Sequence, residues 1–348
     1  MPYGTFGSFF FKKRSSRWPL SSSVVVISCI AQGFTINKDF APWLNRPMAK
    51  ASIIIPVYNR TDVLARALNS IQAQSWRDYD VIVVDDASTE DITKSFPANM
   101  PITYIRHERN KGASAARNTG IKTAQSPFVA LLDSDDTWHP LKLEKQMQFM
   151  EGRHSENIKA SFTSFNMIRP NARNVVRYLK PRKNWKEIII DVCSVSPGST
   201  LVAERTLFED GNIGLYDENL PRLEDWDWLL RYATKHDFGI IQEPLCDVYV
   251  SGTPQTEAVA QSVERIWAKN RRLLLANFSR GTAQKFRASL DFELAGAAFR
   301  RREIFKALGL VVSGAFRSPQ RFWSFIKRIY HKFRDGDYGT SLSLWRRK

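Results

Sequence analysis

The stretch SIIIPVYNRTDVLARALNSIQAQSWRDYDVIVVDD, residues 52–86, consists of an apolar run, an amphipathic segment and a second apolar run. The runs at 52–58 and 79–86 predict buried strands. Between them, apolar residues at 63, 64, 67, 68 and 71 have the spacing of one helix face. A strand, a helix and another strand are the repeating unit of a parallel sheet.

The same alternation continues along the chain. We expect strands at 102–107, 127–133 and 159–168, helices at 113–124 and 224–236, a helix that begins near Pro140, and a strand followed by a short helix at 198–213. The chain is therefore predicted to be α/β, with a mainly parallel, Rossmann-like sheet flanked by helices on both faces. Such sheets bind ligands beyond the carboxyl ends of their strands.

Composition limits the alternatives. The chain has 348 residues, 43% of them apolar, which suffices for one large domain or two modest ones. Its three cysteines form no CxxC pair, which argues against a disulfide framework or a zinc site and fits a reducing compartment. The net charge of +16 belongs to the two ends, +6 in residues 1–50 and +10 in residues 300–348.

The first fifty residues allow two interpretations. FFFKKRSSRWPLSSSVVVISCIAQGF, residues 9–34, has the basic and apolar regions of a secretion signal, although its apolar part at 24–31 is far shorter than the roughly 20 residues of a membrane span. Alternatively, Met48, directly before the first strand, is the true start. We favour this second interpretation, which makes residues 1–48 an unstructured or mis-annotated arm.

Acidic residues follow two of the predicted strands. Asp133, Asp135 and Asp136 come directly after the strand at 127–133, and carboxylates are hard ligands suited to Mg²⁺ or Mn²⁺. The alternative is an acidic loop that caps the next helix, and Asp136 fits that role equally well. In VDDAS, Asp85 and Asp86 could accept hydrogen bonds from a base or a ribose, or could simply form a turn.

Two further segments carry candidate residues. HERNKGASAARNTG, residues 107–120, lacks the spacing of a P-loop, but it places Arg117 and Asn118 early in a helix, where they would face a phosphate or ribose, or solvent. In RLEDWDWLL, residues 222–230, Asp225 is a candidate general base, and Trp226 could stack on a sugar ring. The alternative is an acidic helix start beside core tryptophans. The five histidines form no set and are expected to be structural or exposed.

Four motifs in this order, SIIIPVYNR, VDDAS, NKGASAARNTG with LLDSDD, and LEDWDWLLR, resemble the family-2 glycosyltransferases of the GT-A fold over residues 50 to 250. The resemblance implies an inverting enzyme that uses a nucleotide-diphospho-sugar and Mg²⁺ or Mn²⁺. It also implies specific roles: the nucleotide-sugar site would contain Pro56, Tyr58, Asn59, Asp85, Asp86, Arg117 and Asp133, the metal ligands would be Asp133 and Asp135, and the catalytic base would be Asp225.

The resemblance also suggests an organisation. We expect a catalytic domain at 49–255, with a nucleotide-sugar half at 49–150 and an acceptor half at 151–255, followed by a basic helical region at 256–348. The QxxRW or RxxRW element of processive synthases is missing, which favours the addition of a single, hexose-like sugar. The resemblance further suggests a glycan or lipid-linked acceptor and a role in polysaccharide or lipopolysaccharide biosynthesis. We expect this activity in the cytoplasm. A nucleotidyltransferase of similar fold and a basic nucleic-acid-binding protein are the alternatives.

The basic C-terminal region contains one amphipathic pattern. In RSPQRFWSFIKRIYHKFR, residues 317–334, aromatic and aliphatic residues recur every three to four positions between cations. Such a helix can lie on an anionic membrane surface, here the inner face of the cell membrane, or can pack on the catalytic domain. Nucleic-acid binding is not expected, because residues 51–299 are neutral overall and contain no nucleic-acid-binding signature.

Overall fold

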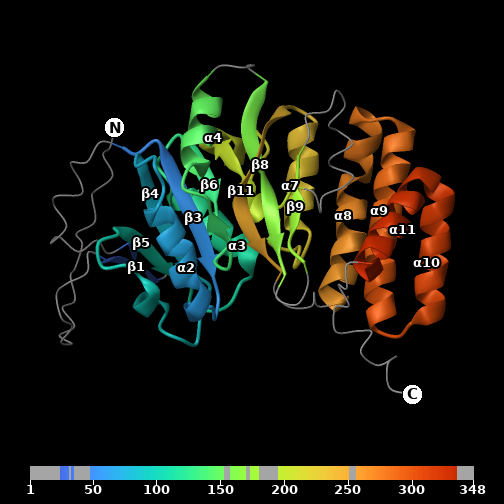
Figure 1. Ribbon diagram of the computed structural model, residues 1–348, viewed down its shortest axis with the longest axis horizontal. Coiled ribbons are helices and arrows are strands. Elements are labelled where there is room, and N and C mark those ends of the chain that lie inside the picture. Colours follow the sequence, from blue (N-terminus) through green and yellow to red (C-terminus); the bar gives the residue numbers. More distant parts are fainter. Residues whose placement is uncertain are drawn as a thin grey trace, which may run out of the picture.

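The computed structural model describes residues 24–30, 33–34, 48–152, 157–169, 173–179, 195–250 and 256–334 (Figure 1). Within them, one mixed sheet has the strand order β2-β1-β5-β4-β3-β6-β10-β8-β11-β7, with β9 paired to β8. The strands are β1 (Val24–Ile30), β2 (Gly33–Phe34), β3 (Ala51–Val57), β4 (Tyr79–Asp85), β5 (Ile102–Arg106), β6 (Phe128–Leu131), β7 (Thr137–Trp138), β8 (Ile158–Ile168), β9 (Val175–Arg177), β10 (Val202–Glu204) and β11 (Asp237–Tyr249).

Helices cover both faces of this sheet, except the last two in the chain, which pack on other C-terminal helices. They are α2 (Thr61–Gln72), α3 (Ala113–Thr123), α4 (Lys142–Glu151), α6 (Pro197–Thr200), α7 (Glu224–Ala233), α8 (Thr256–Asn277), α9 (Arg280–Arg300), α10 (Ile304–Arg317) and α11 (Pro319–Arg334), with 3-10 turns η2 (Ile92–Ser95) and η4 (Arg205–Phe208). Among the described residues, no helix is both long enough and apolar enough to cross a membrane.

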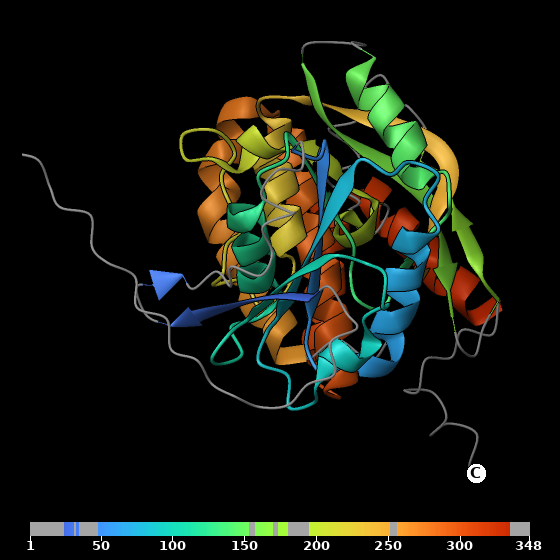
Figure 2. The ribbon, with the colours of Figure 1, turned by 90° about the vertical axis from the view of Figure 1, so that its left-hand side faces the viewer.

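The parallel part of the sheet confirms the predicted fold class. Strands β1, β5, β4, β3 and β6 are neighbours and run parallel. Alternate residues of β3 face opposite sides: Ile53 and Ile55 pack with α2, whereas Ile54 belongs to the cluster that includes α3. Figure 2 shows the blue α2 and the teal α3 on opposite sides of these strands. Gly120 of α3 lies so close to β3 that an added Cβ would be 2.4 Å from Ile54.

The second half of the sheet differs from the sequence-based expectation. β10 is antiparallel to both β6 and β8, and β11 extends the sheet beside β8. Neither β7 nor β11 was predicted, because β7 has two residues and β11 contains Pro244 and register shifts that break the alternation. Residues 198–213 contain a helical turn, a strand and a 3-10 turn, and α4 begins two residues after Pro140.

Described segments near both ends of the chain join the main structure. Val24–Ile30 forms strand β1, which pairs with β5, so the prediction of an unstructured arm is wrong for these residues. At the other end, α8 and α9 contribute to the same buried cluster as the sheet, in which Trp226 of α7 packs edge-on against Phe286 of α9 with ring centroids 4.9 Å apart. The core therefore runs from the sheet into the C-terminal helices without a break.

Candidate active site

The carboxyl ends of β3, β4 and β6 meet at one edge of the sheet, as the sequence predicted. Beyond β3, the Asn59 side chain accepts a hydrogen bond from the Thr89 backbone N–H (2.7 Å), and the Asn59 N–H donates to Ser88 Oγ (2.9 Å). Asn59 has a φ of +50°, a conformation that asparagine adopts more readily than most residues. Tyr58 is exposed beside it, whereas Pro56 is buried within β3.

Asp85, at the end of β4, is fully buried and its carboxylate is occupied by the protein itself. It accepts hydrogen bonds from the Tyr104 hydroxyl, from Arg106 Nη1 and from the Ser88 N–H, each at 2.8 Å. Burial raises the pKa of Tyr104 to about 12, so this hydroxyl remains a donor. The contacts give Asp85 a role in fixing the loop after β4.

Asp86 connects the same loop to the start of α3. Its carboxylate accepts from the backbone N–H groups of Lys111 (2.9 Å) and Gly112 (2.7 Å) and lies 2.7 Å from His107 Nδ1. Burial favours the neutral acid, but the bonds from His107 and the two N–H groups together lower the pKa of Asp86. His107 also contacts Thr119, which confirms that this histidine is structural.

Arg117 joins the two halves of the site. Its buried guanidinium donates from Nη2 to Asp133, beyond β6, and from Nη1 to Glu224, at the start of α7, both at 2.7 Å. Asn118 is instead used structurally, since its side-chain amide donates to the Tyr216 carbonyl (2.9 Å) and accepts from the Tyr216 N–H (3.0 Å). Of the two residues proposed to face a ligand from α3, Arg117 contacts Asp133 and Glu224, whereas Asn118 contacts Tyr216 and Glu218.

The three aspartates that follow β6 have different surroundings. The Asp133 side chain is one-third exposed, and Asp135 is largely buried and ion-paired with Arg60. Asp136 is buried and accepts from the Ser199 hydroxyl and from the Tyr249 N–H (2.8 Å). Burial, together with nearby Asp133, raises the pKa of Asp136 well above its usual range. Asp136 thus ties α6 and β11 to the loop and does not cap α4.

These residues fit a divalent ion only if a ligand supplies further oxygens. No group of three or more His, Cys, Asp or Glu side chains gathers as a metal site within the described ranges. Asp133 and Asp135 nevertheless offer hard carboxylate oxygens at the carboxyl edge, and Mg²⁺ is commonly held by one or two carboxylates plus substrate phosphates. Space beside Asp133 depends on Gly198, where a Cβ would lie 2.3 Å from Asp133 Oδ2.

Asp225 occupies the first turn of α7, next to the arginine that binds Asp133. Burial, reinforced by the adjacent Glu224 and opposed by Arg117, raises the pKa of Asp225 to about 7. The preceding residue, Leu223, is the N-cap of α7 and has a φ of +63°, a left-handed conformation that is unfavourable for a residue with a side chain. The Asp225 carboxylate is therefore able to exchange a proton near neutral pH.

The tryptophans beside Asp225 belong to the core. Trp228 is fully buried and stacks on Tyr232 and Phe208, as expected. Trp226 is only 3% exposed and packs against Phe286, so the prediction that it stacks on a sugar ring is wrong. The helical spacing places both rings inward, because α7 packs between the sheet and the C-terminal helices.

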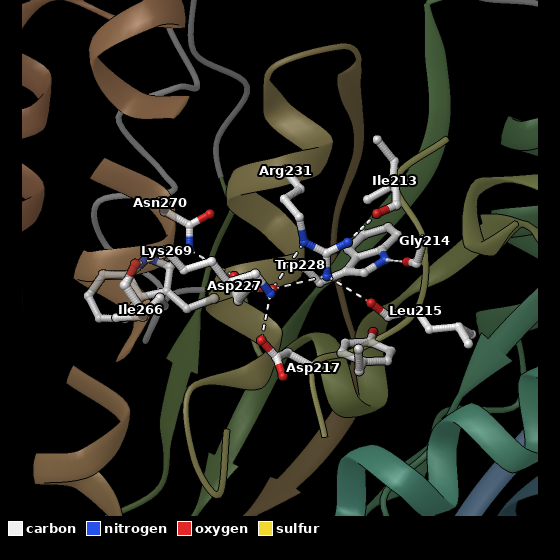
Figure 3. Close-up of polar contacts among 12 residues, drawn as sticks. Ile213, Gly214, Leu215, Asp217, Asp227, Trp228, Arg231, Ile266, Lys269 and Asn270 are labelled. Carbon is white, nitrogen blue, oxygen red and sulfur yellow. Dashed lines mark hydrogen bonds and ion pairs between the residues drawn. The ribbon is translucent and has the colours of Figure 1, made fainter. Parts of the chain in front are cut away.

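A buried ionic network fixes α7 against α8 (Figure 3). The fully buried carboxylate of Asp227 accepts from Arg231 Nε (3.0 Å), Lys269 Nζ (3.0 Å) and Asn270 Nδ2 (2.7 Å). Lys269 also reaches Asp217 at 2.6 Å. Sequence reasoning missed this network, since its members lie up to 53 positions apart and only their contact in the fold reveals it.

The fold is that of the GT-A glycosyltransferases. It is similar to S. aureus TarS 1–349 in complex with UDP-GlcNAc, with a TM-score of 0.57, 20% identity and coverage of 79% of this chain and 83% of that one. It is also similar to the mannosyltransferase PcManGT from Pyrobaculum calidifontis, solved with GDP-Man and Mn²⁺, with a TM-score of 0.51, 16% identity and coverage of 84% and 91%.

Sequence comparison identifies the family. The model of glycosyl transferase family 2 matches residues 52–197, and the uncharacterized glycosyltransferase YwdF of Bacillus subtilis is 31% identical over 206 residues, 57% of this chain and 73% of that protein. The chain belongs to glycosyl transferase family 2.

Two other relatives differ in how much of their length this chain covers. An uncharacterized glycosyltransferase of Rickettsia felis is 34% identical over 212 residues, 60% of this chain, and this chain spans about a third (34%) of its length. The amylovoran biosynthesis glycosyltransferase AmsB of Erwinia amylovora is 24% identical over 298 residues, 81% of this chain and 96% of that protein.

Proposed function

We propose that the protein is an inverting, divalent-cation-dependent glycosyltransferase that adds one sugar from a nucleotide-diphospho-sugar to an acceptor hydroxyl. The observation that carries this proposal is the pair of contacts made by Arg117, which binds Asp133 on the donor side and Glu224 beside Asp225. Through it, the proposed base lies next to the edge where a donor diphosphate would bind.

The donor site is proposed at the carboxyl edge of β3, β4 and β6. Tyr58 and Asn59 would contact the nucleotide from the end of β3, and Asp86 would reach it from the loop after β4. Asp85 and the buried Pro56 would then act through the shape of these loops, because their side chains are already enclosed.

The same edge would hold the cation. Asp135 and Asp133 would bind the ion, which when present neutralises charge that develops on the departing diphosphate. Release of Arg60 from Asp135 would free a second positive charge for that diphosphate.

Asp225 is proposed to perform the proton transfer. Its carboxylate takes the proton of the acceptor hydroxyl as the hydroxyl oxygen bonds to the anomeric carbon, while the bond from that carbon to the diphosphate breaks. Attack from the face opposite the leaving group inverts the anomeric centre. The pKa of about 7 supports this role, since an ordinary carboxylate is a much weaker base.

The acceptor is proposed to be a growing glycan or a lipid-linked saccharide of a cytoplasmic polysaccharide or lipopolysaccharide pathway. The likeness to AmsB, whose name assigns it to amylovoran biosynthesis, supports this class and extends over most of both chains.

The direct test is a screen of UDP-, GDP- and dTDP-sugars for hydrolysis and transfer, with and without Mn²⁺. Metal-dependent release of a nucleoside diphosphate, and a product whose anomeric configuration by NMR is opposite to that of the donor, would support the proposal. Release of pyrophosphate would instead favour a nucleotidyltransferase of similar fold, and retention of configuration would exclude the single displacement.

A further inference from the structure

Helix α10 exposes a continuous apolar line. Phe305, Leu308, Val312 and Phe316 are spaced by three or four residues, so their side chains lie along one face of the helix. Phe305 and Phe316 are 91% and 87% exposed, and Leu308 and Val312 are each more than half exposed. In Figure 1, α10 lies at the outer side of the C-terminal helices, away from the sheet. Monomeric proteins seldom expose such a line of large apolar side chains.

Helix α11 adds two aromatic side chains to this end of the molecule. Trp323 and Tyr330 are both 62% exposed and lie seven residues apart, hence on one side of the helix. Much of the remaining pattern in 317–334 packs inward: Phe325 stacks on Phe292 of α9 with centroids 4.6 Å apart, and Arg321 is buried against Ser289. The outermost apolar surface is therefore on α10, which the sequence pattern did not indicate.

The charge of this region has one sign. Residues 304–334 contain no Asp or Glu, and their cations are Lys306, Arg317, Arg321, Lys327, Arg328, Lys332 and Arg334. Lys306 is paired with Glu303, the N-cap residue of α10, and Arg317 with Asp291 of α9, whereas Lys327 of α11 is exposed. An exposed apolar face accompanied by cations and lacking carboxylates is typical of helices that lie in the interface of an anionic bilayer.

We propose that α10, together with Trp323 and Tyr330 of α11, docks the protein onto an anionic lipid surface. The large side chains of α10 would enter the boundary between headgroups and acyl chains, and the exposed Lys327 would face the lipid phosphates. A second copy of the chain is a poorer occupant, because two such faces would bring cations such as Lys327 together, while the nearby carboxylates of Glu303 and Asp291 are already paired with Lys306 and Arg317. The inference does not depend on the proposed sugar transfer.

Sedimentation of the full chain with vesicles tests this proposal. Vesicles of phosphatidylcholine mixed with phosphatidylglycerol should bind the protein, vesicles of phosphatidylcholine alone should bind it much less, and added salt should weaken binding. The double variant Phe305→Ser, Phe316→Ser should bind about tenfold more weakly, corresponding to roughly 1.4 kcal/mol. Both side chains are almost fully exposed, so the variant should keep its circular dichroism spectrum and melting temperature.

Two further variants separate the contribution of the apolar face from that of the positive charge. Tyr178→Ser removes an aromatic ring, 62% exposed like Trp323 and Tyr330, from the residue after β9 and should leave vesicle binding unchanged. Lys327→Gln should reduce binding to anionic vesicles and lessen its salt dependence. The proposal is overturned if the double variant binds vesicles as the parent does. It is also overturned if the phenylalanines are needed for a dimer formed without lipid, or for tight nucleic-acid binding in place of vesicle binding.

Discussion

Arg117 and Glu224 lie 107 positions apart in the sequence, and their side chains form an ion pair 2.7 Å long that connects α3 with α7. Because the second nitrogen of the same guanidinium binds Asp133, one buried cation holds the acidic residue after β6 and the start of α7 at a fixed separation. If the proposed roles hold, the separation between the donor site and the base Asp225 depends on this single side chain.

Arg117→Lys should impair both stability and transfer. One ammonium group cannot reproduce the fork that binds Asp133 and Glu224 together. Breaking a buried pair costs about 3–5 kcal/mol, and exposure of Asp133 should reduce the loss here to roughly 2 kcal/mol. Urea unfolding and kcat/KM measure the two effects. An unchanged kcat/KM in a destabilised variant would restrict Arg117 to a structural role.

Asp225→Asn should abolish transfer and leave nucleotide binding intact, since the amide keeps the shape but cannot accept the proton. Turnover by steady-state assay and donor affinity by calorimetry separate the two. Asp210→Asn, an exposed acid in the turn after η4, is the matched control and should behave as the parent. Parent-level turnover in the Asp225 variant would remove this residue from the role of base.

The dependence of kcat on pH should follow the titration of the Asp225 carboxyl group. Because its pKa is raised to about 7, Asp225 is protonated below that pH, and kcat should rise as the pH increases through about 7. The stability of the protein should change in the opposite direction. In the unfolded chain the pKa of Asp225 is near 3.8, so its contribution to the free energy of unfolding falls as the pH rises from about 4 to about 7. A kcat that stays constant across this range would contradict the assignment.

Asp135→Ala should lose the metal-dependent part of nucleotide binding. Calorimetry with a nucleoside diphosphate, with and without Mn²⁺, measures it directly. The variant also frees Arg60, so binding without metal should be unchanged or slightly stronger. If Mn²⁺ strengthens binding equally in the variant and the parent, the ion is held elsewhere.

Asp227→Ala should destabilise the protein by about 3 kcal/mol, because it leaves Lys269 and Arg231 without their buried partner. Asp217→Ala, which removes a partly exposed partner of Lys269 only, should cost much less. Equal losses in urea unfolding would show that Lys269 is stabilised mainly through Asp217.

Most of the parallel half of the fold could be predicted, because β3, β4 and β6 are mainly apolar runs and α2 has clear helical periodicity. The positions of Asp133 and Asp135 followed from where these runs end. The mixed half could not, since β11 contains a proline and irregular register, and β7 is too short to carry a pattern. Strand β1 was interpreted as part of an arm because a short apolar run after a basic segment is ambiguous.

The roles inside the site were harder to predict. Sequence alone cannot distinguish a carboxylate that awaits a ligand from one already satisfied by the protein, as Asp85 and Asp136 are. Nor does it show that Lys142, fully buried and lying over the Trp138 ring at 3.6 Å, has a pKa lowered to about 7 by burial. These properties arise from contacts between distant segments.

The network around Asp227 makes the position of α7 depend on helix α8, which follows it in the chain. A chain that ended at residue 255 would keep Asp227 and Arg231 but lose Lys269 and Asn270. It would therefore lose the polar contacts that join α7, the helix that carries Asp225, to α8. A C-terminal region taken from another protein would preserve this network only if it supplied a cation and an amide at the positions of Lys269 and Asn270. In this chain, helix α8 thus completes the support of the helix that carries Asp225.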